Sequence, residues 1–309
     1  MSNLTSRREF FFAYDIRMGN PNGDPDENRP RVLPDATYYV TDVRLKRFVR
    51  DFLKTQGHDI LVDTIEDKTT NLTGRVAQYL EDKDIAKAEG KKLVDILLSS
   101  FVDARMFGSS FAFKKQDKWE PKPIPKTLTG AIQINHGEVL HEAEPVDIHG
   151  TSVFGSQEEK AQKTFTTYFG LRYALIGFHG IANEHSAALS KLSEDDYQMF
   201  LAAAWKSVRS AGNTRTKVGQ VPRLLISIEY EEGEEFQLGS LLDYVKLVPA
   251  NGKAEKEWSS PADYKVDLSL LTARLDGCDK EVATVSSEIS PDVQFAEEPP
   301  TDWNALNID

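Results

Sequence analysis

One stretch of the chain combines residue types that bind phosphate with residue types that hold a loop in one shape. Residues 18–34 show no apolar periodicity and contain four prolines, two glycines and several turn-forming Asn and Asp residues. So many stiff and capping residues favour a single fixed conformation over a flexible linker. Such a loop would present backbone N–H groups and the guanidinium groups of Arg29 and Arg31, which are suitable donors for phosphate.

Two other interpretations of this loop must be weighed. It could simply carry the chain across the surface from a strand to a helix, and the composition alone leaves that open. It could also bind calcium, because Asn20, Asn22 and Gly23 match part of an EF-hand loop. The calcium interpretation fails because the first and last ligand positions would fall on Met18 and Arg29, and neither side chain binds a cation.

A basic helix is predicted directly after the loop, over residues 41–56. Its apolar residues recur at helical spacing and form a buried stripe, and Thr41 is a suitable N-cap. Four cations, uninterrupted by an acid, occupy its other faces: Arg44, Lys46, Arg47 and Arg50. A charged face is often only solvated, but cations so close to a basic loop indicate a phosphate-binding track.

A second basic loop is predicted at residues 213–223, between a helix and a strand. Its sequence, NTRTKVGQVPR, contains Arg215, Lys217 and Arg223. Two basic loops and one basic helix therefore lie on a chain whose overall charge is negative.

The composition describes a globular protein with a substantial core. At 309 residues the chain could form one large domain or two. No apolar run approaches membrane-spanning length, and the N-terminus passes into a strand without a signal-peptide core. Cys278 is the only cysteine, so disulfides and thiolate zinc sites are excluded and a cytoplasmic location is expected.

The net charge of −12 is concentrated at one end of the chain. Residues 1–224 contain 31 basic and 30 acidic residues, whereas residues 225–309 contain 6 basic and 19 acidic residues. Local patches, and not the total charge, therefore indicate which partner the protein binds.

The order of the predicted elements indicates an α+β fold. Strands are expected at residues 9–17, 132–134, 170–182 and 224–230, and helices at residues 41–56, 83–100 and between 193 and 212. This order is compatible with a βαββαβ ferredoxin-like frame, which also underlies the RNA-recognition module, with large insertions. Residues 136–169 are expected to form a β-hairpin or excursion, and residues 281–309 a poorly ordered acidic tail.

Several motifs resemble the signature of a known family. Residues 19–31 (GNPNGDPDENRPR) and 40–47 (VTDVRLKR) are followed by 103–108 (DARMFG), 129–134 (TGAIQI), the segment 168–173 and 213–223. Together they resemble the CRISPR-associated Cas-seven family, which supplies the backbone subunit of type I Cascade complexes. The likeness is greatest to the type I-B branch, called Csh-two.

The resemblance implies an architecture and a role. We expect an RNA-recognition-like palm of the RAMP type over residues 1–280, with a finger insertion at about 57–130 and a thumb hairpin at about 136–169. Copies of such a subunit stack helically along one CRISPR RNA and kink it periodically, and the guide then pairs with target DNA. The expected partners are the RNA, further copies of the chain, a Cas-five-like cap, and the large and small subunits. No cofactor, metal or catalytic activity is implied.

A guide-holding subunit must tolerate any sequence, so its contacts should go to phosphate and sugar. The predicted RNA-binding residues are Asn20, Asn22, the Gly23 backbone, Arg29, Arg31, Arg44, Lys46, Arg47, Arg50, Met106, Phe107, Gly108, Gln133, Val153, Phe154, Arg215, Lys217 and Gln220. Met106 and Phe107 are nominated as a wedge against a base, although both could equally be core residues. Val153 and Phe154 are nominated as the thumb tip.

Other functions compete with this interpretation. A metal-dependent endoribonuclease of the type III backbone kind would use a loop aspartate, and the candidates are Asp15, Asp24, Asp26 and Asp103. His136, His141 and His149 lie among acidic residues, but their spacing is not that of a helical metal pair. A general single-stranded RNA-binding protein, or a module that binds an acidic protein, would also use a basic stripe.

Overall fold

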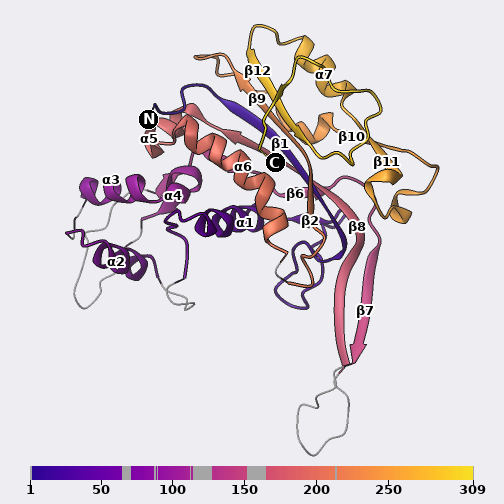
Figure 1. Cartoon of the computed structure of the whole chain (residues 1–309), viewed down its shortest axis with the longest axis horizontal. Helices are drawn as coiled ribbons and strands as arrows, with labels where there is room; N and C mark the ends of the chain where they lie inside the picture. Colours follow the sequence, from indigo (N-terminus) through magenta and orange to yellow (C-terminus); the bar gives the residue numbers. More distant parts are fainter. Residues whose placement is uncertain are drawn as a thin grey trace, which may run out of the picture.

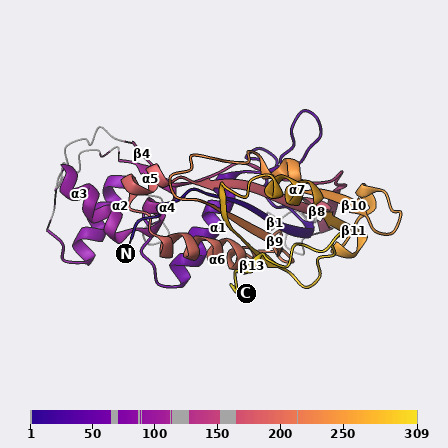
Figure 2. The same ribbon diagram turned by 90° about the horizontal axis from the view of Figure 1, so that it is seen from above.

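The computed structural model describes residues 2–64, 71–86, 88, 90–111, 113, 127–151, 165–212 and 214–308. A large sheet forms the centre, with helices on one face and the C-terminal part of the chain on the other (Figure 1). A lobe of short helices and the C-terminal elements lie toward opposite ends of the long axis (Figure 2). None of the helices in these ranges has the length and apolar character required to cross a bilayer.

The central strand of the sheet is β1 (Arg8–Gly19), which extends the predicted strand at 9–17. It pairs antiparallel with β8 (Phe165–Ala182) on one side and β9 (Val221–Tyr230) on the other. The path through the sheet is β13-β12-β9-β1-β8-β6-β2, and β5 and β7 also pair with β8. The remaining strands are β2 (Tyr39–Val40), β5 (Ile132–Ile134), β6 (Gly137–Val139), β7 (Pro145–Thr151), β12 (Val282–Ile289) and β13 (Asn304–Ala305).

Two helices cover one face of this sheet, α1 (Asp42–Thr55) and α6 (Glu194–Ser210). They pack against one another and against the fully buried rings of Phe10, Phe12 and Tyr14 on β1. Ser193 begins α6 with a capping box, in which its hydroxyl accepts from the Asp196 amide and the Asp196 carboxylate accepts in return. The strands predicted at 132–134, 170–182 and 224–230 and both of these helices are confirmed.

We call residues 236–308 the C-terminal module. Its β12 and β13 extend the sheet at the β9 edge, and the rest of the module covers the opposite face of the sheet. Phe11 and Ala13 of β1 pack there against Trp258, Tyr264 and Leu271. Its elements are η1 (Leu241–Tyr244), β10 (Lys246–Pro249), η2 (Glu255–Glu257), η3 (Pro261–Asp263), β11 (Tyr264–Asp267), α7 (Ser269–Asp276), β12 and β13. Because β1 has large apolar side chains on both faces, each face needs a covering layer.

The prediction that residues 281–309 form a poorly ordered tail is wrong. Val282 to Ile289 form β12, which pairs antiparallel with β9 along its whole length. Acidic composition suggested disorder, but the edge of β9 supplies the hydrogen bonds, and Val285, Phe295 and Trp303 pack against the core of the C-terminal module. Tertiary pairing therefore overrides a weak local propensity.

A helical lobe occupies most of the predicted finger region at 57–130. It contains α2 (Leu72–Asp82), which the sequence did not predict, α3 (Gly90–Ser100), α4 (Val102–Phe107) and the short pair β3 (Gly108–Ser110) and β4 (Thr127–Thr129). The lobe has its own apolar core, which includes Leu80, Leu93 and Phe101. Farther along the chain, α5 (Glu184–Ser190) follows β8. Within the predicted helix at 83–100, α3 begins at Gly90, and the described residues 83–86 are not helical.

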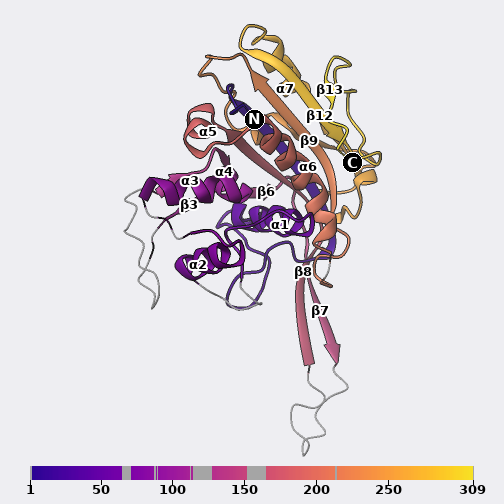
Figure 3. The same cartoon turned by 60° about the vertical axis from the view of Figure 1, so that its left-hand side comes forward.

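The expected hairpin between residues 136 and 169 is formed by β7 and the first half of β8. The two strands pair antiparallel from Pro145–Leu171 to Thr151–Phe165 and project away from the rest of the molecule (Figure 3). Val153 and Phe154, nominated as the thumb tip, lie outside the described residues.

Removing residues 281–309 should destabilise the whole fold, because the deletion exposes β9 and the apolar side chains beneath β12. Loss of that burial corresponds to about 5 kcal/mol, so the Tm in a thermal scan should fall by roughly 10 °C, or the protein should be insoluble. The matched control is Glu297→Gln with Glu298→Gln, which removes acidic charge from exposed positions in the same segment and should leave Tm unchanged. A truncated protein with the Tm of the full chain would mean that these residues are dispensable.

Candidate nucleic-acid interface

A basic cavity of about 540 Å³ lies where the loop at 19–31, α1, α6 and the loop at 214–220 meet. Three cationic side chains line it, Arg44, Arg47 and Lys217. Among the described residues of its wall, Asp51 is the only carboxylate, and it pairs with Arg47 at 2.8 Å. Hydroxyl and amide groups complete the lining, so the cavity offers cations and neutral donors to an anion.

The loop at 19–31 has the fixed shape that its composition predicts. The Asp24 carboxylate accepts from the amides of residues 26, 27 and 28 at 2.8–3.0 Å. Asn22 Oδ1 accepts from both the amide and the hydroxyl of Thr41 at 2.9 Å, which joins the loop to the start of α1. A Cβ at Gly23 would lie 1.9 Å from Asn28 Oδ1, so only glycine fits there.

This internal bonding corrects the prediction that Asn22 binds RNA, whereas Asn20 also lines the basic cavity and its contact with RNA remains a prediction. Both are buried, and Asn20 Nδ2 donates to the carbonyl of Asn28 at 2.7 Å. Short polar side chains in tight turns commonly bond to nearby backbone, which the sequence pattern does not distinguish from ligand binding. Both side chains shape the loop.

The cations of α1 separate into two groups, so a single four-residue track is not formed. Arg44 and Arg47 face the basic cavity. Lys46 instead pairs with Asp42 at 2.9 Å, and Arg50 pairs with the buried Asp103 at 2.8 Å. Residues 44 and 47 share a helix face, as do 46 and 50, because neighbours on a helix surface are three or four positions apart. For Lys46 and Arg50, the contacts that the structure shows are therefore internal.

Two arginines stack on aromatic rings at the root of the β7–β8 hairpin. The Arg29 guanidinium lies 3.8 Å from the ring centroid of Phe169, and Arg215 lies 4.7 Å from that of Tyr168. Successive residues of a strand point to opposite faces, so the two basic loops hold the hairpin from both sides. Both arginines remain exposed.

Arg31 lines a smaller hollow of about 290 Å³ between the loop and the hairpin root. The rings of Tyr38, Tyr39 and Phe169 contribute to its wall. The Nε atom of Arg31 is buried and has no hydrogen-bond partner among the described residues. The predicted role of Arg31 in RNA binding is therefore compatible with its position.

The segment at residues 103–108 is largely structural. Met106 is completely buried in the core beneath the helices, which corrects its nomination as a base wedge. Gly108 is also buried and has a positive φ of 75°, and a Cβ there would lie 2.2 Å from the carbonyl oxygen of Leu128. Phe107 is half-buried, and the guanidinium of Arg50 lies 5.0 Å from its ring centroid. Only Phe107 remains a candidate for contact with a base.

Two further nominated residues have amide side chains that bond to backbone carbonyls. Gln133 is exposed and donates to the carbonyl of Gly130 at 2.8 Å, so its contact with RNA remains a prediction. Gln220 is buried and donates to the carbonyl of Val208 at 3.2 Å, which excludes a surface contact for this side chain.

Arg215, Lys217 and Gln220 were predicted to form a second patch, either on RNA or on the neighbouring subunit, but the side chain of Lys217 points inward. It is buried, and its Nζ donates to the carbonyls of Asn20 and Pro21. Several polar residues that line the cavity were not predicted from the sequence, among them Asn28, Ser210, Thr214 and Thr216. Each lies within or beside a basic segment, but Ser, Thr and Asn are too common in loops to be selected on type alone.

Comparisons with known proteins show the family to which the chain belongs. The sequence profile of the family described as CRISPR-associated protein Cas7 matches residues 6–269. The chain belongs to the Cas7 family. A Cas7 protein of Haloferax volcanii is 31% identical over 287 residues, which cover 88% of this chain and 83% of that protein. The family resemblance predicted from the motifs is therefore confirmed.

Solved structures show the same fold at low sequence identity. One chain of a CRISPR RNA-guided surveillance complex has a TM-score of 0.55 and 13% identity, covering 98% of this chain and 95% of its own. A chain from such a complex in a pre-nicking state has a TM-score of 0.52 and 11% identity, with coverage of 97% and 96%. Nearly the whole Cas7-family chain, including the C-terminal module, therefore belongs to a recurring fold.

Three of the four aspartates considered for metal-dependent cleavage accept hydrogen bonds within the protein, whereas Asp26 is exposed. Asp15 is buried and accepts from Arg223 and from the hydroxyl of Tyr173, at 2.7 and 2.8 Å. Asp103 accepts from the amides of Leu61 and Val62 as well as from Arg50. Across the described ranges, no group of three or more His, Cys, Asp or Glu residues is arranged to hold a metal ion.

The three histidines considered as metal ligands each contact different residues. His141 stacks against Tyr173 and Trp258, and burial lowers the pKa of its imidazole. His136 lies 3.3 Å from an oxygen of Asp42, and the exposed His149 contacts the hydroxyl of Thr167.

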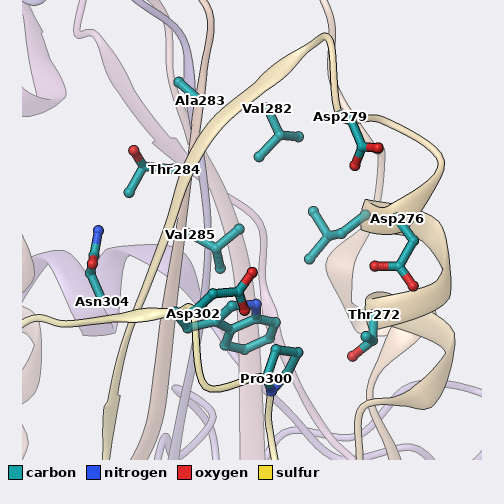
Figure 4. A pocket seen from close by; sticks show the side chains of 12 residues that line it. Thr272, Asp276, Asp279, Val282, Ala283, Thr284, Val285, Pro300, Asp302 and Asn304 are labelled. Atoms are coloured by element: carbon teal, nitrogen blue, oxygen red, sulfur yellow. The ribbon is translucent and has the colours of Figure 1, made fainter.

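A different cavity, between α7, β12 and residues 300–304, is acidic (Figure 4). Its volume is about 290 Å³, and Asp276, Asp279 and Asp302 lie around it together with Trp303. Three carboxylates repel phosphate, so this cavity is unsuited to nucleic acid. Phosphate binding by this Cas7-family chain is therefore expected at the basic cavity.

The stability of the protein should rise between pH 7 and pH 9 through Lys217. Burial, with a contribution from the nearby Arg44, lowers the pKa of Lys217 from 10.5 to about 7. The unfolded chain then binds more protons in this range, so the free energy of unfolding should increase by up to about 1.4 kcal/mol per pH unit. Urea unfolding at pH 7, 8 and 9 should show a smaller rise for Lys217→Met, and identical pH profiles would contradict this expectation.

Proposed function

We propose that this Cas7-family chain is a non-catalytic, CRISPR RNA-binding backbone subunit of a type I surveillance complex, of the I-B kind, acting in antiviral defence in the cytoplasm. The observation that carries the proposal is the basic cavity, in which Arg44 and Arg47 of α1 face two ordered polar loops. Cations and neutral donors of this kind bind phosphate and sugar and leave base edges free. That is the requirement for holding a guide of any sequence.

The topology supports an RNA-recognition-like palm of the ferredoxin type. Within the sheet, the order β9-β1-β8-β6 corresponds to the fourth, first, third and second strands of a βαββαβ unit. The helices of that unit are α1 and α6, which lie together on one face. The lobe with α2, α3 and α4 would be the fingers, and the β7–β8 hairpin would be the thumb.

The projecting hairpin suggests how copies would assemble. A strand pair that extends beyond its own core can reach over the RNA bound to a neighbouring copy and interrupt base stacking at regular intervals. Repetition of such a head-to-tail contact gives an open helical filament along the guide. The other partners would be a Cas-five-like cap, the large and small subunits, and target DNA paired to the guide.

The contacts of three candidate aspartates support the proposal that the subunit is non-catalytic. Asp15 and Asp103 are buried in ion pairs, and Asp24 accepts three backbone amides, so none of these three is presented as an open metal ligand. The fourth candidate, Asp26, is exposed and is left as the one to test. Metal-dependent cleavage needs carboxylates that can coordinate an accessible ion. EDTA-sensitive periodic cutting of bound RNA would favour the endoribonuclease alternative.

The test is the salt dependence of binding to single-stranded RNA. The double variant Arg44→Gln with Arg47→Gln removes two cations from the cavity, so the slope of log K against log salt should become shallower by roughly 1.4, at about 0.7 per phosphate contact. Affinity should change equally for unrelated RNA sequences. Fluorescence anisotropy at four salt concentrations provides the measurement.

The matched control is Lys246→Gln with Arg274→Gln, which removes the same charge from exposed positions of the C-terminal module. Its slope should equal that of the wild type. Equal slopes for both double variants would exclude the basic cavity as the phosphate site. Binding that is unchanged by guide length, or confined to one sequence, would instead favour a general or sequence-specific RNA-binding protein.

A further inference from the structure

Lys217 connects two segments that are distant in the sequence. Its side chain is only 9% exposed, and its ammonium donates to the carbonyl oxygens of Asn20 and Pro21, at 2.9 Å for the second. These carbonyls lie at the beginning of the loop at 19–31, which forms one wall of the basic cavity. Lys217 itself lines the same cavity from the loop at 214–220.

The main chain reinforces this connection. The amide of Asn20 donates to the carbonyl of Thr216 at 3.1 Å. A Cβ at Gly19 would lie 2.8 Å from the same carbonyl oxygen, so the two segments approach as closely as glycine allows. Gln220 then ties the second loop to α6 through the carbonyl of Val208. A continuous set of contacts therefore runs from α6 through the loop at 214–220 to the loop at 19–31.

The partners of Lys217 are unlike those of a lysine that binds phosphate. Both described hydrogen bonds of its Nζ go to buried backbone oxygens, and neither partner is a carboxylate. Buried carbonyl oxygens need hydrogen-bond donors. Removing the ammonium would take away the hydrogen bond that Lys217 donates to the carbonyls of Asn20 and Pro21. A neutral amine still has two N–H groups, so deprotonation would preserve both bonds.

We infer that Lys217 is a positioning residue that holds the loops at 19–31 and 214–220 together, so that Arg44, Arg47 and the loop amides face one RNA strand. Lys217 does not contact phosphate in this arrangement. The inference rests on the proposed RNA-binding function and adds a residue whose contribution is geometric. It differs from the expectation, drawn from the sequence, that Lys217 is part of a phosphate-binding patch.

The decisive variant is Lys217→Met, which keeps an unbranched side chain of similar length. It removes the ammonium group and therefore both of its hydrogen bonds. The affinity for single-stranded RNA should fall about 10-fold or more at every salt concentration, whereas the slope of log K against log salt should stay that of the wild type. In the free protein, hydrogen–deuterium exchange should become faster at residues 20–31 and remain unchanged in β1 and α6. Faster exchange confined to this loop separates a positioning role from general destabilisation.

Two control variants are measured alongside Lys217→Met. Arg47→Gln removes a cation from the cavity wall, so its slope should become shallower by about 0.7 while exchange in the loop stays slow. Val218→Ser changes an exposed neighbour of Lys217 and should alter neither affinity nor exchange. If Lys217→Met does not fold, Lys217→Gln, which keeps one donor group, should give the same pattern with smaller changes.

Three results would overturn the inference. A slope shallower by about 0.7 in Lys217→Met, with unchanged exchange, would make Lys217 a direct phosphate contact. Unchanged affinity would deny it any role in binding. Unchanged exchange together with weaker binding would show that the loops do not depend on it. If wild-type protein binds no RNA, the proposed function fails, and the exchange data still decide whether Lys217 joins the loops.

Discussion

The structure depends on a central strand that is buried on both faces. Phe10 and Phe12 of β1 point toward the helices, whereas Phe11 and Ala13 point toward the C-terminal module. Asp15, on the same strand, is buried and bonds to Arg223 of β9 and Tyr173 of β8. Burying a carboxylate is unfavourable unless it is paired and hydrogen-bonded, so this ion pair fixes how the three central strands meet.

The candidate RNA site is a direct consequence of that arrangement. The strands β1 and β9 are neighbours, so the loop that follows β1 and the loop that precedes β9 emerge side by side and meet at Lys217. The helix α1 begins where the first loop ends, and Asn22 bonds to Thr41 at that junction. The basic cavity therefore forms from segments that are almost 200 residues apart in sequence.

The distribution of charge gives the molecule two electrostatically different sides. The helical face contains the basic cavity, whereas the C-terminal module covers the other face and contributes most of the excess acid. An RNA strand near the molecule would be attracted to the first side and repelled by the second. Because the acidic segment is folded onto the sheet, this asymmetry is built into the structure and does not require a mobile tail.

The sequence by itself determined the central strand, both helices that cover one face of the sheet, the fixed loop at 19–31 and the family, because each depends on periodicity, turn chemistry or a local motif. Only the tertiary structure decided that β12 completes the sheet and that Met106 is buried. It also decided that Arg44 and Arg47 share a cavity while Arg50 pairs with Asp103. A charged or polar residue type shows that an interaction will form, but its partner depends on which distant segments the fold brings together.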